Sequence, residues 1–265
     1  GSVTTAMAVR LEREIATLAG RLVRYESPSA LDLARMAGID PDPWQQDVLQ
    51  SRSRRVLLNC CRQSGKSTIT AIVAVDTALS VPRSLVLLVS PTLRQSGELF
   101  RKALAVYRAA DRPIPADAET ALSLSLSNGS RIVSLPGKEA TVRGYSGAAL
   151  IAIDEASRVP NDLYLSLRPM LAVSGGRLIA LSTPFGTRGW WYEAWRSREA
   201  WERVRITAAQ VDRIPAAFLE EERRTLGPWW YAQEYEGEFM DAQSQIFTRA
   251  EIDHAFVEEV ATWTL

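Results

Sequence analysis

The sequence is poor in the residues that usually build disulfide frameworks and metal centres. It holds two cysteines and one histidine in 265 residues. Cys60 and Cys61 are neighbours, so they can form neither a disulfide scaffold nor a C-x-x-C metal or redox pair. We therefore expect a reduced, cytosolic setting. The single histidine, His254, has no accompanying cluster of metal ligands, and we assign it no function.

Long apolar runs and a net charge are also missing. The longest apolar stretches, such as residues 148–153, are far too short to span a bilayer. Arg and Glu are interspersed near the start of the chain, so we expect no signal peptide and no membrane association. The 31 Lys and Arg balance the 31 Asp and Glu. Cations are in excess in residues 1–150, which could bind an anionic polymer, but two surface faces without a partner explain this equally well.

The composition that is present belongs to a folded α/β protein. Hydrophobic residues make up 46% of the chain and charged residues 23%, as in globular domains. Apolar strands alternate with helices, which predicts a mainly parallel sheet covered by helices on both faces. Asn128-Gly129 predicts an antiparallel hairpin beside it. The main predicted strands span residues 55–60, 85–90, 150–154 and 177–181, and the first is followed by a helix over residues 67–79.

Three segments are expected along the chain. Residues 1–42 form an N-terminal helical segment, with an apolar helical period over residues 7–24 and a short helix near residues 30–37. The rigid Asp-Pro-Asp-Pro joint at residues 40–43 begins a core over residues 43–211. The remaining segment, residues 212–265, is helical and acidic.

The sequence Cys-Cys-Arg-Gln-Ser-Gly-Lys-Ser-Thr at residues 60–68 lies between a predicted strand and a predicted helix. A phosphate-binding loop needs this context, because backbone N–H groups at a helix N-terminus bind phosphate. Lys66 would reach the β- and γ-phosphates, and the Ser67 hydroxyl would hold Mg²⁺. Cys60 stands where the G-x-x-x-x-G-K-[ST] pattern has its first glycine. The alternative, a chance surface turn, is disfavoured by the flanking strand and helix.

Two further strands end in polar residues. The apolar strand at residues 150–154 delivers Asp154 and Glu155 at its carboxyl end, where open α/β sheets place ligands. Asp154 would bind Mg²⁺ and Glu155 would act as general base toward water; taken alone, two solvated acids at a strand end are as good an explanation. Ser182 and Thr183 end the next strand and could sense the γ-phosphate, although a simple turn before proline explains them too.

Together these motifs resemble the ATPase domain of the large terminase subunit, the DNA-packaging motor of tailed phages. The resemblance covers roughly residues 43–248 and rests on five matches in the family's order. They are Trp44-Gln45 followed by Asp47 and Leu49, Arg62-Gln63 in the loop, Arg143-Gly144, Ser182-Thr183-Pro184, and Gln233-Glu234-Tyr235 with Glu238-Phe239.

The resemblance implies a P-loop NTPase core of the additional-strand type, with a small, mostly helical lid from residues 1–42 and 212–265. It implies catalytic roles for Glu155, Lys66, Arg62 and Arg143. Arg143 would be an arginine finger for a neighbouring subunit; the alternative is a structural arginine that pairs with an acid such as Glu139. The implied nucleotide-binding residues are Trp44, Gln45, Cys61, Arg62, Gln63, Ser64, Gly65, Lys66, Ser67 and Thr68; the coupling residues are Ser182 and Thr183; and the Mg²⁺ ligands are Ser67 and Asp154.

The resemblance also implies ATP hydrolysis that moves double-stranded DNA into a procapsid. The implied partners are the portal, the small terminase subunit and further copies in a ring, such as a pentamer, in the host cytoplasm; the isolated domain is expected to be monomeric. The nuclease domain that follows in this family is expected to be absent. Candidate DNA contacts are Arg101, Lys102 and Arg131. The alternatives are a superfamily-two helicase-like remodeller and a nucleotide-binding switch.

Overall fold

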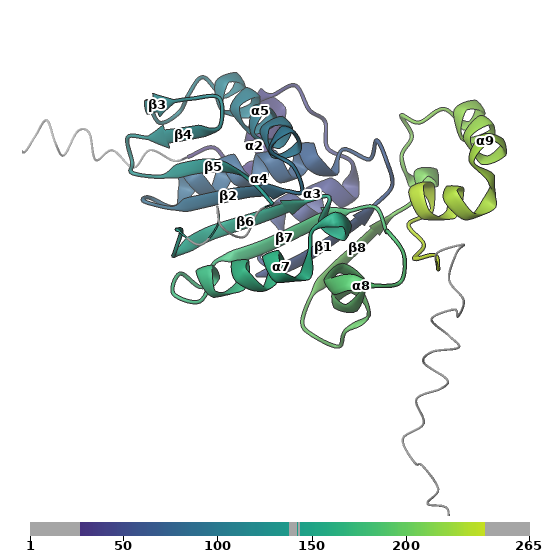
Figure 1. The fold of residues 1–265 in the computed structure, drawn as a ribbon. Coiled ribbons are helices and arrows are strands. Elements are labelled where there is room, and N and C mark those ends of the chain that lie inside the picture. The colour runs from purple at the N-terminus through teal and green to yellow at the C-terminus, as the bar shows by residue number, and fades with distance from the viewer. Residues whose placement is uncertain (1–26, 138–141, 143, 242–265) are drawn as a thin grey trace, which may run out of the picture.

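A computed structural model of the chain describes residues 27–137, 142 and 144–241. An eight-stranded sheet runs through its centre in the order β3-β4-β5-β2-β6-β7-β1-β8 (Figure 1). Its strands are β1 (Arg55–Cys60), β2 (Leu85–Ser90), β3 (Ala116–Glu119), β4 (Ser123–Leu126), β5 (Arg131–Pro136), β6 (Ala148–Asp154), β7 (Arg177–Ser182) and β8 (Glu202–Ile206). The helices are α2 (Ala30–Met36), α3 (Pro43–Gln50), α4 (Lys66–Ser80), α5 (Leu93–Ala109), α7 (Asn161–Leu167), α8 (Gly189–Arg196) and α9 (Ala216–Tyr235).

The sheet is mostly parallel, as the sequence predicts. The five pairings from β5 through β2, β6, β7 and β1 to β8 are all parallel. The strands β4 and β5 pair antiparallel across the Asn128-Gly129 turn, so the predicted hairpin is present. A further antiparallel strand, β3, extends this edge. The two edge strands β3 and β8 were not predicted from the sequence.

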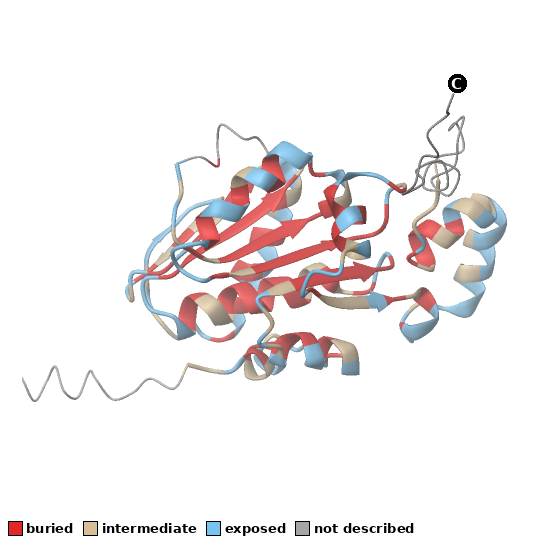
Figure 2. Ribbon diagram, turned by 90° about the horizontal axis from the view of Figure 1, so that it is seen from below, coloured by how far each residue is buried: buried red, intermediate tan, exposed pale blue. Residues whose placement is uncertain are grey.

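Helices cover both faces of the sheet, so its inner strands have no solvent-exposed side. All six residues of β2 are buried. Because successive side chains of a strand point to opposite faces, Val86 and Leu88 pack under α2, α4 and α5, whereas Leu87 and Val89 pack on the side of α7 and α8. Figure 2 shows the inner strands as buried along their length. Continuous apolar strands therefore mark the centre of the core.

The N-terminal helix α2 belongs to the packed core in this structure. Ser29 caps it in a reciprocal arrangement with Asp32, and Leu33 and Ala34 are fully buried against the cluster that α4 and α5 share. The described part of the predicted 1–42 segment thus packs on the core. The predicted helix over residues 7–24 lies outside the described residues.

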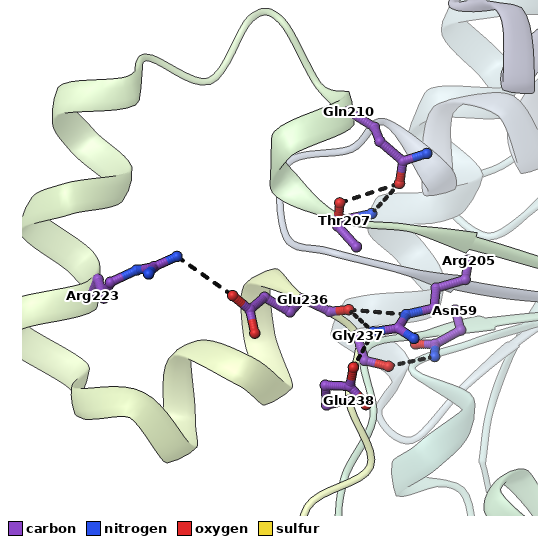
Figure 3. Close-up of polar contacts among 8 residues, drawn as sticks. All are labelled: Asn59, Arg205, Thr207, Gln210, Arg223, Glu236, Gly237 and Glu238. Atoms are coloured by element: carbon purple, nitrogen blue, oxygen red, sulfur yellow. Dashed lines mark hydrogen bonds and ion pairs between the residues drawn. The ribbon is translucent and has the colours of Figure 1, made fainter.

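The helix α9 projects from one end of the molecule (Figure 1) and is largely exposed (Figure 2). Gly227 has φ 74° and ψ 167°, so α9 consists of two helical halves joined by a kink. Its C-terminal end returns to the core, as Figure 3 shows. Arg205 of β8 donates to the Glu236 carbonyl from Nε at 3.1 Å and from Nη2 at 2.7 Å, and Asn59 of β1 donates to the Gly237 carbonyl at 2.9 Å. In the described part of the chain, no helix has the length and apolar character needed to cross a membrane.

Candidate functional site

The loop between β1 and α4 is shaped by two residues in the left-handed region. Gln63 has φ 60° and Gly65 has φ 86°. A Cβ atom on Gly65 would lie 2.8 Å from the Gln45 side chain and 3.2 Å from the Arg213 side chain, so both the backbone angle and the space require glycine here. Lys66 follows at once as the first residue of α4. The predicted strand–loop–helix unit is therefore present.

The Ser64 carbonyl is the point at which the rest of the protein holds this loop. Gln45 of α3 donates to it from Nε2 at 3.0 Å, and Arg213 donates to it as well. Asp42 ties these two donors together, because its N–H donates to Gln45 Oε1 at 2.9 Å and its carboxylate pairs with Arg213 at 2.8 Å. In a trans peptide the next N–H points opposite to the carbonyl. The Gly65 N–H is thus turned away from Gln45 and Arg213.

The Lys66 side chain points back toward the start of the loop. Its ammonium donates to the Cys61 carbonyl at 3.3 Å, and the residue is only 8% exposed. The first N–H groups of any α-helix have no partner within the helix and carry partial positive charge. A buried ammonium beside the N-terminus of α4 therefore makes this loop electropositive, which suits an anion.

Two acids stand at the carboxyl end of β6. In the sheet, Asp154 pairs with Leu181 of β7, which in turn pairs with Leu58 of β1, so one strand separates the acid from the loop strand. Burial and the neighbouring Glu155 charge raise the pKa of Asp154 to about 6, against the opposing influence of Lys66. Glu155 itself has left-handed angles, φ 51° and ψ 43°, and its N–H donates to Asp154 Oδ1 at 2.9 Å.

Ser182 links the end of β7 to the segment that follows these acids. Its Oγ lies 2.7 Å from Ser157 Oγ and accepts from the Ser157 N–H at 3.2 Å. Ser182 is fully buried, and Thr183 is 7% exposed. A movement of Ser182 would therefore displace Ser157, which is two residues from Glu155. The coupling role of Ser182 and Thr183 stays a prediction.

Arg62 of the loop is held by the last turn of α9. Its Nε donates to Glu234 Oε2 at 2.6 Å, and its N–H donates to the Glu234 carbonyl at 3.2 Å. The hydrogen bond to Glu234 raises the pKa of the Arg62 guanidinium. The predicted phosphate contact of Arg62 would therefore be made by its remaining guanidinium N–H groups or in exchange for Glu234.

Two predicted nucleotide-binding residues are turned into the protein. Trp44 is half-buried against the cluster of α2, α4 and α5, with its Nε1 buried. Cys61 is fully buried, and burial raises the pKa of its thiol to about 11. Its N–H donates to the Ile206 carbonyl at 2.8 Å. Trp44 thus lies as a core tryptophan would, and Cys61 as a structural residue.

A pocket of about 570 Å³ lies over the loop. Residues 63–68 form one part of its lining, Lys102 of α5 adds a cation, and residues 213–215 with Phe218 form the remaining part. Lys102, a candidate DNA contact from the sequence, thus lines this pocket. The other two DNA candidates lie elsewhere: Arg101 pairs with Glu98, and Arg131 lines a separate pocket beside β4. Arg143 lies outside the described residues.

The part of the lining formed by residues 213–215 and Phe218 was not predicted from the sequence. Arg213 is 149 residues from Ser64 along the chain, and no local pattern indicates that the segment before α9 returns to the loop. Glu234 was noted only as part of a family motif, and its contact with Arg62 spans an even longer stretch of chain, 172 residues.

Comparison with known proteins decides the family. The model of the family described as "Terminase large subunit, T4likevirus-type, N-terminal" matches residues 57–254. This chain belongs to the terminase large subunit family. The match covers the N-terminal part of that subunit and favours the terminase interpretation over the helicase alternative.

Individual terminases agree with this assignment. The large terminase subunit of Thermus virus P23-45 is 27% identical over 177 residues, which are 60% of this chain and 36% of that protein. This chain thus spans about a third of the length of the curated relative that it matches.

Solved terminase structures share the fold. The large terminase ATPase domain of Thermus phage P74-26 superposes with a TM-score of 0.69 at 22% identity, covering 78% of this chain and 97% of that one. The large terminase of another thermophilic bacteriophage, solved in complex with ADP, gives 0.64 at 13% identity, covering 76% and 54%. The expected P-loop fold of the additional-strand type is confirmed.

Proposed function

We propose that the pocket over the β1–α4 loop binds and hydrolyses ATP, and that this activity drives double-stranded DNA into a procapsid. One arrangement carries the proposal. The loop leads into Lys66. The paired acids Asp154 and Glu155 lie at the same carboxyl-terminal end of the sheet strands, and β7 is the one strand between them and β1. A phosphate-binding loop and an acidic pair at this separation are the parts that nucleotide hydrolysis needs.

The loop side would bind the phosphates. Lys66 and the first N–H groups of α4 would face the β- and γ-phosphates, where they offset negative charge. Gln63, Ser64, Gly65, Ser67 and Thr68 line the same wall. Arg62, whose Nε is bonded to Glu234, would offer guanidinium N–H groups to the γ-phosphate and stabilise the charge that develops there. Lys102, in the same pocket, is better placed for a phosphate of the nucleotide than for DNA.

Ser67 and Asp154 would hold Mg²⁺. They fit the ion because Mg²⁺ prefers oxygen ligands and is commonly bound by one or two protein groups together with substrate phosphates. Asp154 is 8% exposed, and its charge is poorly solvated there, so a cation would offset the cost of ionising it. When bound, Mg²⁺ neutralises phosphate charge. Glu155, beside this carboxylate, would accept the proton of the attacking water.

The remaining roles concern the assembled motor. We propose double-stranded DNA, the portal and the small terminase subunit as partners, a ring of subunits as the working form, and the host cytoplasm as its location. Arg143, which precedes β6, would act as an arginine finger toward a neighbouring subunit. Arg101 and Arg131 remain the candidates for DNA phosphates, because a packaging motor gains from contacts that ignore sequence.

Steady-state ATP hydrolysis and nucleotide binding test the proposal in the Lys66→Ala and Glu155→Gln variants. We expect Lys66→Ala to lose binding. Glu155→Gln should keep binding and lose turnover by about 10²-fold or more, because only proton transfer is removed. Asp117→Asn, an acid-to-amide change at the exposed edge strand β3, serves as the matched control. Wild-type turnover in Glu155→Gln would refute its role as base, and unchanged binding in Lys66→Ala would refute the site.

Double-stranded DNA provides the second part of the test. Hydrolysis that rises on adding duplex DNA of unrelated sequences supports translocation, because contacts to the phosphate backbone do not depend on sequence. An ATPase rate that duplex DNA leaves unchanged, in the full-length subunit assembled on its portal, would contradict it.

A further inference from the structure

The two walls of the pocket differ in chemistry. On one side lie the loop residues 63–68 and Lys102, which offer N–H groups, hydroxyls and cations. The rest of the lining comes from residues 213–215 and Phe218: the Arg213 guanidinium is engaged by the Ser64 carbonyl and by Asp42, and Ile214, Pro215 and Phe218 form an apolar wall. A nucleotide has the same division, with a charged polyphosphate at one end and a flat, largely apolar base at the other. The pocket thus has a matching place for each end.

Phe218 stands out on the apolar wall. It lies in the first turn of α9 and is 41% exposed, so its ring is accessible to a ligand in the pocket. Its ring contacts Tyr235 in an edge-to-face manner, with centroids 6.4 Å apart and planes at 74°. Tyr235 is only 5% exposed and belongs to the core cluster. The Phe218 ring is therefore supported on one side and accessible on another.

The start of the apolar wall, at Ile214, is held close to the loop. Arg213, next to Ile214, donates to the Ser64 carbonyl and pairs with Asp42, and Ile214 packs against the core cluster. A binding surface held on a supported framework loses less conformational entropy when a ligand docks. The same carbonyl holds the phosphate loop, so the distance between the two walls is set by shared contacts.

We propose that Ile214, Pro215 and Phe218 form the platform on which the purine base of the nucleotide packs, with the Phe218 ring as its stacking partner. This inference rests on the proposed function, because it assigns the second end of the same ligand. Trp44, which the family resemblance implies as a nucleotide-binding residue, does not line the pocket. The platform lies at the start of α9, so the base would contact the projecting helix as well as residues packed on the core.

Removal of the Phe218 ring tests the proposal with two ligands that share a polyphosphate but differ in the base. The binding of MgATP and of magnesium tripolyphosphate is measured by calorimetry in wild type, Phe218→Ala and Phe218→Tyr. We expect Phe218→Ala to weaken MgATP by about 10-fold or more, as loss of an aromatic–base stack does, and to leave tripolyphosphate unchanged. Phe218→Tyr, which keeps a ring, should stay near wild type for both ligands.

Trp230→Ala is the matched control. Trp230 lies in the same helix and is also 41% exposed, but it does not line the pocket, so its loss should leave both affinities unchanged. Equal weakening of MgATP and tripolyphosphate in Phe218→Ala, or no weakening of either, overturns the platform while the phosphate site stands. A wild-type protein that binds neither ligand, or a Lys66→Ala variant that binds tripolyphosphate normally, refutes the proposed function and the platform with it.

Discussion

The central sheet and the helix α9 are built in opposite ways. In β2 every residue is buried, whereas only four residues of the twenty in α9 are buried, namely Tyr231, Gln233, Glu234 and Tyr235. Apolar burial holds the strands together. The helix instead relies on its two tyrosines and on polar contacts such as Arg62–Glu234 and Arg205 with the Glu236 carbonyl. A segment with few buried apolar contacts opens at lower free energy than a core.

This contrast matters because both regions border the pocket. The loop and Lys66 come from the sheet side, and Phe218 comes from α9. Polar contacts can be exchanged for contacts with a ligand, whereas buried leucines cannot. We therefore expect the sheet to position the reacting groups and α9 to be the element that responds to the nucleotide.

The largest expected effect comes from truncating a side chain in the sheet. Leu88→Ala should lower the free energy of unfolding by about 2–5 kcal/mol, because it leaves a cavity in a fully buried strand. Leu226→Ala, a partly buried leucine of α9, should cost about 1 kcal/mol or less. Urea denaturation followed by circular dichroism measures both. Equal losses would mean that α9 is as much a part of the core as β2.

Asp154 should give an effect of opposite sign in metal-free protein. Its pKa is raised to about 6, so the folded state disfavours the ionised carboxylate, and stability falls as pH rises from near 4 to above 6. Asp154→Asn removes this cost. We expect the variant to be more stable than wild type by up to about 3 kcal/mol above pH 6, with the gap closing toward pH 4.

Thermal denaturation in the presence of a chelator measures this difference, and the Asp117→Asn variant controls for loss of an exposed acid. A variant that is less stable than wild type at pH 8 would show that Asp154 has a compensating partner. Such stabilisation with loss of activity is the usual sign that a group is retained for function and not for the fold.

A smaller effect is expected from Glu234→Gln. The Arg62 side chain is 61% exposed, so loss of its pairing should change global stability only slightly. Local opening should increase, because Glu234 is one of the few contacts that hold the C-terminal half of α9. Hydrogen exchange in residues 228–236 should therefore quicken, and Glu236→Gln, whose partner Arg223 is 3.5 Å away and exposed, should change it less. Unchanged exchange in Glu234→Gln would show that the tyrosines alone hold the helix.

The same contrast explains how much could be predicted from the sequence. The strands β1 and β2 and the helix α4 were predicted with almost the observed bounds, because fully buried strands and the loop between them leave a local signature. The edge strand β8 has charged residues at Glu202, Arg203 and Arg205. Its apolar pattern is therefore weak, and only pairing with β1 defines it.

The site divides in the same manner. Short motifs predict Lys66, Asp154 and Glu155. The structure places all three at the carboxyl ends of the sheet strands. Lys102, Arg213 and Phe218 reach the pocket only through tertiary packing. Arg213 contacts the loop across 149 residues of chain, and no spacing rule relates positions so far apart.

Hydrogen exchange with and without a non-hydrolysable MgATP analogue tests most directly the claim that the sheet and α9 build one nucleotide site together. We predict that the nucleotide slows exchange in both the loop, residues 61–67, and residues 213–235, while the already buried strands β2 and β6 change little. The Lys66→Ala variant should show neither change. Protection confined to the loop, with residues 213–235 exchanging as fast as in the free protein, would contradict the account.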